Sequence, residues 1–287
     1  MILIRECRGF EELQACVDLQ IEVWGYSDGD VIPRRVFLVA QKIGGQAIGA
    51  FEVQGAGNER QGLGNREQGI ENLGDASSMV GFAFGLPGVK TGEQSGSGRP
   101  ESYLHSHMLA VKEGFRNQNI GARLKLAQRE DALRRGIERM EWTFDPLEIK
   151  NAFLNIRKLG AIVRRYEENF YGASSSRLQG GLQTDRLVAE WWLDSPRVKA
   201  ATAGTGRTAG RPGEDYLDTI RVPAAIYEWK DDPELRHLAA KVQAENRARF
   251  QEAFARGLAV VHFDRDVNGD GIFYIGSYPA SGNQALL

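Results

Sequence analysis

The most regular pattern of hydrophobic and polar positions lies between Ser102 and Gly136. Up to Val111, apolar or aromatic residues alternate with small or polar ones, which is the period of a half-buried β-strand. A short polar turn follows, and then a basic amphipathic stretch with helical spacing. The pattern therefore predicts a strand, a loop and a helix, and the rest of the chain is organised around this unit.

Similar periodicities predict further elements on both sides of this unit. Strands are expected at 2–5, 47–53, 79–85, 139–144, 161–167, 187–193, 220–223, 258–263 and 272–278. Helices are expected at 11–24, 33–44, 149–160 and 233–256, where apolar residues recur at helical spacing. This mixed order of strands and helices predicts an α/β fold with a mixed sheet.

The composition divides the chain into two parts. A first domain is expected over 1–195, with a flexible insertion at about 54–78, where Gly, Asn, Gln and Glu leave too little apolar surface to order the chain. Small and polar residues over 196–216 predict a linker. The remaining segment, 217–287, is expected to be a C-terminal α/β extension packed on the first domain, because it holds too little core to stand alone.

The loop between the central strand and its helix carries the clearest candidate chemistry. Between Arg116 and Ala122, small residues and residues that tolerate positive φ stand where a helix begins. The free N–H groups and the positive dipole end of a helix start bind phosphate. The helix also carries more cations than anions, and these cations are Arg123, Lys125, Arg129, Arg134 and Arg135. We therefore expect the loop to bind a ligand that carries phosphates.

These residues resemble a known superfamily. FRNQNIGARL is similar to the Arg-x-x-Gly-x-Gly/Ala pyrophosphate loop of the GNAT acyl-CoA N-acyltransferases, with Asn119 in place of the first glycine. The motifs HSHMLAV, LKLAQRE, WTFDPL, NAFLNIRKLG and NFYG resemble one branch of that superfamily, and so does the Thr184-Asp185-Arg186 run. The resemblance is dense from about Ser102 to Leu193.

The resemblance implies a GNAT-like fold and an acyltransferase that moves acetyl from acetyl-CoA to a primary amine by direct attack in a ternary complex. It implies no metal. It also implies which residues bind the co-substrate. For the pyrophosphate these are Arg116, Asn117, Gln118, Asn119, Ile120, Gly121 and Ala122, and for the pantetheine arm Leu109, Ala110, Val111, Asn151 and Asn155.

The group that takes the proton from the amine stays open at this point. By the period of two, the central strand places on one face Tyr103, His105, His107, Leu109 and Val111. An imidazole titrates near neutrality and suits proton transfer, so His105 and His107 are candidates. Two hydrogen-bonded core histidines are an equal alternative. Glu52 and Glu101 are carboxylate rivals that would act through water.

The tyrosine with which many members of the superfamily protonate the departing thiolate is missing. Ile156 stands at its position, so the proton has to come from another donor, such as Tyr166 or Tyr171, or from solvent. Arg157 and Lys158 on the same predicted helix are candidates for contacts with the nucleotide phosphates, although exposed helix charges are usually just solvated.

Two further motifs are interpreted as structural. Asp185 and Arg186 predict a buried ion pair, with a clamp for a substrate carboxylate as the alternative. The acidic run from Asp264 to Gly271 imitates the start of a calcium loop, but Ile275 stands where that loop needs a bidentate acid. The run therefore predicts a hairpin turn.

Composition narrows the partners. The chain of 287 residues has a formal net charge of −2, which gives no electrostatic reason to expect nucleic acid or an anionic membrane. Cys7 and Cys16 make no disulfide framework. We expect neither a signal peptide nor a transmembrane helix, because no apolar run is long enough. The expectation from composition is thus a cytoplasmic protein. The resemblance implies that it acts on a small-molecule amine, alone or as a homodimer.

Two other functions stay open from sequence alone. One is a succinyl-CoA-dependent amino-acid N-acyltransferase, which pocket width and an arginine that pairs with a carboxylate would indicate. The other is a non-catalytic CoA-binding module, which would bind acetyl-CoA without releasing its thiol.

Overall fold

The structure is a computed structural model that describes residues 1–26, 29–53, 77–91, 99–174, 176–203 and 216–279. The insertion predicted at about 54–78 lies outside the described residues except for its last two positions, which begin a strand. None of the helices in the described ranges has the length and apolar character of a membrane span.

Ten strands form one sheet in the order β1-β2-β3-β4-β5-β7-β6-β9-β10-β8. Their bounds are β1 (Ile2–Glu6), β2 (Gln46–Val53), β3 (Ser77–Lys90), β4 (Glu101–Val111), β5 (Arg139–Phe144), β6 (Ile162–Glu167), β7 (Arg186–Trp192), β8 (Asp218–Val222), β9 (Leu258–Arg265) and β10 (Gly271–Ser277). Neighbouring strands are antiparallel, except that β4 and β5 are parallel. The predicted mixed α/β sheet is confirmed.

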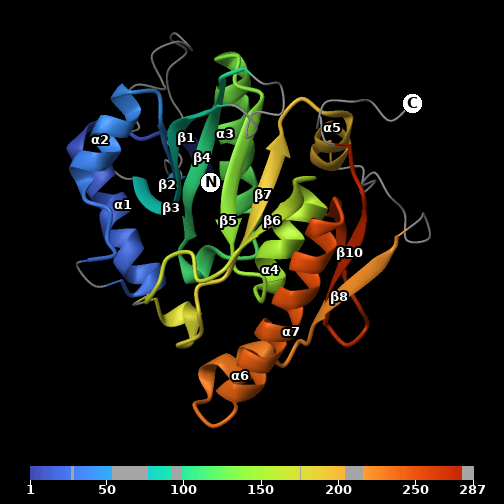
Figure 1. Cartoon of the computed structure of the whole chain (residues 1–287). Helices are drawn as coiled ribbons and strands as arrows, with labels where there is room; N and C mark the ends of the chain where they lie inside the picture. Colours follow the sequence, from blue (N-terminus) through green and yellow to red (C-terminus); the bar gives the residue numbers. More distant parts are fainter. Residues whose placement is uncertain (27–28, 54–76, 92–98, 175, 204–215, 280–287) are drawn as a thin grey trace, which may run out of the picture.

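Helices cover both faces of the central strands. They are α1 (Gly9–Trp24), α2 (Arg34–Lys42), α3 (Ile120–Arg134), α4 (Ile149–Ala152), α5 (Pro196–Thr202), α6 (Ile226–Asp231) and α7 (Arg236–Ala255). Phe37 of α2 packs on Phe82 and Phe84 of β3, whereas Leu124 of α3 packs with Ala83. Because consecutive side chains of a strand point to opposite faces, α2 and α3 lie on opposite sides of the sheet, as Figure 1 shows.

The C-terminal strands continue the same sheet, because β9 pairs with β6 at Val163 and Val260. Helix α7 packs across β6, β8 and β9, where the ring of Phe250 contacts those of Tyr166 and Phe273. Strands β9 and β10 form a hairpin at the acidic run, which confirms the predicted turn.

Two local predictions need correction. The linker predicted over 196–216 is wrong for its first part, because Pro196–Thr202 forms α5. The Ser195 side chain accepts a hydrogen bond from the N–H of Val198 and caps this helix, and a proline at the first position favours it. The helix predicted at 149–160 begins as α4 and continues as a π-helical turn over Phe153–Lys158.

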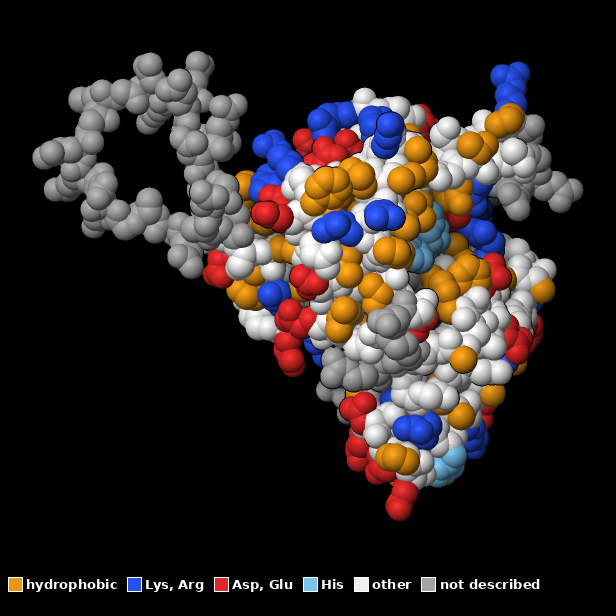
Figure 2. Space-filling model, turned by 90° about the vertical axis from the view of Figure 1, so that its left-hand side faces the viewer, with side chains coloured by type: hydrophobic (Ala, Val, Ile, Leu, Met, Phe, Trp, Pro, Cys, Tyr) orange, Lys and Arg blue, Asp and Glu red, His pale blue; other side chains and the backbone are white. Residues whose placement is uncertain are grey.

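The side of the molecule formed by α1 and α2 carries exposed apolar side chains. These are Phe10, Ile21, Val36, Leu38, Val39 and Ile43. Figure 2, which looks onto this side, shows apolar side chains interspersed with lysine, arginine and acidic residues. Scattered apolar side chains are normal on a protein surface, so this face by itself does not identify a partner.

Candidate functional site

The candidate site lies where β4 and β5 part. The two strands pair at Leu104–Met140 and His105–Glu141. Beyond these pairs, β4 remains hydrogen-bonded to β3, and β5 to β7. Among the described residues, no further backbone pairing joins β4 and β5, which leaves a gap between the two strands. A cavity of about 410 Å³ opens there. The residues of β4 that line it are Ser106, His107, Met108 and Leu109.

A β-bulge at His107 bends β4 beside this cavity. Ser106 lies opposite Gly85 and Met108 lies opposite Phe84, so His107 is the extra residue on β4. A bulge leaves its extra residue outside the ladder and increases the local twist. The bulge thus directs β4 away from β5 at the level of the cavity.

The bulge also corrects the face that the sequence pattern predicts for this strand. Tyr103 and His105 line a second, smaller cavity, whereas Leu109 and Val111 pack with α3 on the other face of the sheet. The prediction of one common face is therefore wrong beyond His107. The extra residue shifts by one position the alternation of side chains between the two faces of the sheet.

The loop before α3 has the backbone conformation that an anion site needs. Asn117 and Asn119 adopt positive φ values of 63° and 61°, and α3 begins directly afterwards at Ile120. The N–H groups of a first helical turn have no partner within the helix. The ammonium group of Lys158 donates a hydrogen bond to the Asn119 side chain at 3.3 Å. A cation therefore lies beside these amides.

The loop lies next to the wall of the main cavity. A methyl group placed on Gly121 would lie 3.7 Å from Leu109 and 3.8 Å from Leu154, and both leucines line the cavity. Asn151 and Asn155, from α4 and the π-helical turn, line it as well. The structure thus brings together the loop and three of the residues predicted to contact the pantetheine arm.

Three other sequence candidates lie elsewhere. Glu52 is paired with Ile2 in the β1–β2 ladder, and the side chain of Ala110 is buried in the core under α1 and α2. The hydroxyl of Tyr166 donates to the carboxylate of Asp185 at 2.5 Å. Burial and that carboxylate raise the pKa of Tyr166 above its ordinary value. None of these three side chains lines the main cavity.

The two candidate histidines face different cavities. His107 lines the main cavity, whereas His105 lines the second one, of about 200 Å³, together with Lys90 and Glu141. Burial lowers the pKa of His107. Burial, followed by the neighbouring His107, lowers the pKa of His105 to about 4. Burial thus favours the uncharged form of both imidazoles.

Lys125 and Ser106 are cavity residues that the sequence analysis missed. Lys125 is 2% exposed and lines the cavity, whereas the sequence analysis counted it only among the cations of the helix. Its Nζ atom lies 2.7 Å from the Ser106 hydroxyl and 3.5 Å from the ring centroid of Trp142. Helical spacing offered a signal, because Lys125 stands three positions before the buried Gln128 and seven before the buried Ala132.

Asp185 and Arg186 do not form the predicted ion pair. Asp185 is bound instead by Arg247 of α7, at 2.9 Å. The Arg186 guanidinium donates to the side chain of Gln179 at 3.2 Å and to the backbone oxygen of Asp185 at 2.8 Å, and lies 5.2 Å from the ring centroid of Tyr171. It lines the main cavity, so it is placed to meet a bound anion.

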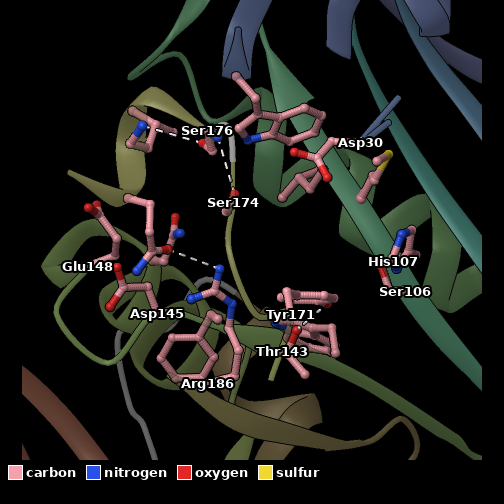
Figure 3. A pocket seen from close by; sticks show the side chains of 18 of the residues that line it. Asp30, Ser106, His107, Thr143, Asp145, Glu148, Tyr171, Ser174, Ser176 and Arg186 are labelled. Carbon is pink, nitrogen blue, oxygen red and sulfur yellow. Dashed lines mark hydrogen bonds between the residues drawn. The ribbon is translucent and has the colours of Figure 1, made fainter. Parts of the chain in front are cut away.

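Figure 3 shows how these side chains surround the open space. Ser106 and His107 lie on one side of it, Asp145 and Glu148 on the opposite side, and Arg186 between them. Both carboxylates pair with the single ammonium group of Lys230 on α6, at 3.1 and 3.0 Å. Among the described residues, no cluster of three or more potential metal-ligating side chains occurs. The site therefore consists of an anion loop, an open strand edge and a cavity with polar walls.

Comparison with known proteins finds no matching family model and no matching curated protein. Similar solved structures include NAA60 of Arabidopsis thaliana in complex with acetyl-CoA, at 13% identity over 67% of this chain and 98% of that one, with a TM-score of 0.49. The ribosomal-protein-S18-alanine N-acetyltransferase of Escherichia coli matches at 12% identity over 67% and 93%, with a TM-score of 0.42. A GNAT-family acetyltransferase of Streptococcus pneumoniae matches at 15% over 66% and 98%, with a TM-score of 0.44. Sequence identities of 12–15% and TM-scores below 0.5 do not establish a function. The function therefore has to be inferred from the cavity itself.

Proposed function

We propose that this protein is an acyl-CoA-dependent N-acyltransferase of the GNAT superfamily, which transfers acetyl from acetyl-CoA to a primary amine by direct attack in a ternary complex. The observation that carries the proposal is the gap between β4 and β5 beside the loop of 116–122. The gap offers an open strand edge for an extended ligand, and the loop offers helix-start amides for its diphosphate. The sequence motifs quoted above support the same reading.

Each part of an acyl-CoA has a partner in this arrangement. The loop amides and the Lys158 ammonium would hold the pyrophosphate. The backbone at Leu109, with Asn151 and Asn155, would hold the amide groups of the pantetheine arm. A strand edge that has no ladder partner presents N–H groups, and one of them would stabilise the oxygen of the tetrahedral intermediate. The thioester would then lie near Ser106 and the His107 bulge.

The acceptor would enter from the opposite wall. That wall is built by the end of α1, by the residues that follow β5 and by the segment between β6 and β7. Binding both substrates in one cavity lets the amine attack the thioester directly, because the reacting atoms are held together. The acceptor is proposed to be a small-molecule primary amine, and segment 217–287 an extension that supports this wall.

Arg186 favours a second, related function, in which one of the substrates carries a carboxylate. Its guanidinium lines the cavity and, among the described residues, forms no ion pair with an acidic side chain. A guanidinium binds a carboxylate through two parallel hydrogen bonds. An amino-acid acceptor, or a succinyl group in place of acetyl, would supply a carboxylate for the Arg186 guanidinium to bind.

The test combines binding with turnover. Isothermal titration should detect binding of CoA and of acetyl-CoA, and a thiol-release assay should detect turnover in a panel of amino acids, polyamines and peptide N-termini, with acetyl-CoA and succinyl-CoA compared. Binding without thiol release in any combination would favour the non-catalytic module. Absence of CoA binding would reject the proposal as a whole.

A further inference from the structure

Lys125 is a buried amine on the wall of the cavity. It projects from α3, the helix that begins at the phosphate loop, and is 2% exposed. Its nitrogen contacts the Ser106 hydroxyl at 2.7 Å and the face of Trp142 at 3.5 Å from the ring centroid. Ser106 also contacts the side-chain oxygen of Gln128 at 2.8 Å. The three polar groups form a chain that starts at the cavity and ends inside the protein.

No carboxylate neutralises this lysine within the described part of the chain. The titratable groups on the elements packed around it include His105 and His107 on β4, Arg139 and Glu141 on β5, and Arg129 and Asp131 on α3 itself. Glu141 pairs with Lys90 at 2.8 Å, and Asp131 pairs with Arg135 at 2.7 Å. Across the cavity, Asp145 and Glu148 pair with Lys230.

Such surroundings favour the uncharged amine. Removing an ammonium from water is costly when no carboxylate compensates for it. Burial accordingly lowers the pKa of Lys125 well below its ordinary value. An uncharged lysine has a lone pair and accepts a proton, which a histidine with a pKa of about 4, such as His105, does only weakly at neutral pH.

We propose that Ser106 and Lys125 are the proton-accepting pair of the acyl transfer: Ser106 contacts the attacking amine, and Lys125 holds the proton that Ser106 passes on. This inference rests on the proposed function and names the base for it. Neither of the histidines nor Glu52 is needed for this step. Ser106 is suited to the contact because it stands on the open edge of β4, directly before the bulge at His107.

The proton balance of the step is complete. The acceptor ammonium gives one proton to the Ser106 oxygen, while the hydroxyl proton of Ser106 moves to the Lys125 nitrogen. The free amine then forms the new C–N bond with the thioester carbon, and the nitrogen of this tetrahedral intermediate loses its second proton to solvent. The C–S bond breaks, and the thiolate leaves with the proton that Lys125 returns through Ser106. The hydroxyl has to turn from Gln128 towards Lys125, and a serine hydroxyl rotates freely enough to do so.

The first test is a pH profile of kcat/KM with the best amine from the acceptor panel and acetyl-CoA. Lys125→Met keeps the length and removes the base, and should lower kcat/KM at pH 7 by about a hundredfold or more. The deficit should shrink as the pH rises towards the pKa of the acceptor, because the free amine then exists without help. A loss of similar size at every pH would overturn the proposal, since this is what a structural role produces.

Three further variants distinguish a base from a cation at Lys125 and a proton relay from a packing role at Ser106. Lys125→Arg keeps a positive charge but cannot accept a proton, so it should be as impaired as Lys125→Met; recovery of the rate would mean that the charge is what matters. Ser106→Ala should show the same pH-dependent deficit, and Ser106→Thr, which keeps the hydroxyl, should restore much of the rate. Lys241→Met on the exposed surface of α7 is the control and should leave the profile unchanged.

The second test needs no acceptor. NMR titration of protein labelled with ¹³C at the lysine Cε should show one lysine that loses its proton at a clearly lower pH than the others, with its signal absent from Lys125→Arg. If all lysines lose their protons together in the ordinary range, the proposal is wrong, while binding of acetyl-CoA would still support the acyltransferase. Mass spectrometry of protein mixed with acetyl-CoA alone provides another check: an acetyl group on Ser106 would replace the relay by a covalent route.

Discussion

The ammonium group of Lys230 on α6 lies 3.1 Å from a carboxylate oxygen of Asp145, which follows β5 on the wall of the cavity. The same ammonium lies 3.0 Å from Glu148, and Lys230 is 4% exposed. Burial opposes the charge, but Asp145 and Glu148 together raise the pKa of Lys230 above its ordinary value. The C-terminal part of the chain thus supplies the cation that holds this wall together.

Lys230→Met should therefore destabilise the whole fold. The substitution leaves Asp145 and Glu148 without their cation, and breaking a buried ion pair from one side costs about 3 kcal/mol or more. Urea unfolding monitored by tryptophan fluorescence measures the change. Lys241→Met, whose side chain is 72% exposed, is the matched control and should cost less than about 0.5 kcal/mol. Equal midpoints for both variants would show that the buried pair contributes nothing.

Gly121→Glu should abolish binding of acyl-CoA while the protein stays folded. A Cβ atom added at Gly121 meets only ordinary contacts, at 3.7 and 3.8 Å, and the negative charge of the glutamate would stand at the helix start where the diphosphate is proposed to bind. We expect Kd for CoA to rise at least about tenfold, measured by isothermal titration. Ala240→Glu adds the same charge on the exposed surface of α7 and should leave Kd unchanged. Tight CoA binding by Gly121→Glu would place the diphosphate elsewhere.

The sequence predicted the features whose causes are local. The positive φ values at Asn117 and Asn119 follow from residue type, and the start of α3 follows from the spacing of apolar residues. The order of strands and helices was sufficient to predict the mixed sheet. The Ser195-Pro196 start of α5 was an equally local signal that a compositional reading of the segment overlooked.

The features that the sequence did not predict depend on residues far apart in the chain. The bulge at His107 is a relation between β4 and β3, so no period within β4 reveals it. The partner of Asp185 is Arg247, sixty-two positions later, and this freed Arg186 for the cavity. Lys125 could have been recognised by its helical spacing, but its partner Ser106 could not, since their contact depends on the packing of α3 on β4.

Arg186→Gln should raise KM for acceptors that carry a carboxylate and leave KM for other acceptors unchanged. If the Arg186 guanidinium binds a carboxylate, its loss should raise KM for an acceptor that carries one by roughly tenfold to a hundredfold, because a charge-assisted hydrogen bond contributes about 1.5–3 kcal/mol. The matched descarboxy amine should show an unchanged KM in the same variant. A uniform rise in KM for both amines would mean that the substitution disturbs Tyr171 and Gln179 rather than a carboxylate contact.

His262 should make the fold sensitive to acid. It is 1% exposed and its ring packs near those of Tyr216 and Tyr274, which also contact each other. Burial, followed by the charge of Arg157, lowers the pKa of His262 to about 4 in the folded protein, whereas an unfolded histidine has a pKa of about 6.5. Because the folded pKa is the lower one, the contribution to stability is complete above pH 6.5 and is lost as the pH falls towards 4.

The measurement is the urea unfolding free energy at pH 7.5, 5.5 and 4.5. His262→Phe fills the same aromatic site without a titrating group, so wild type should lose on the order of 2 kcal/mol more than this variant between pH 7.5 and 4.5. Part of the acid sensitivity should persist in the variant, because the pKa of His105 is also about 4. His237→Gln, at an exposed position on α7, should reproduce the wild-type dependence. Parallel curves for wild type and His262→Phe would show that His262 takes up no proton on unfolding.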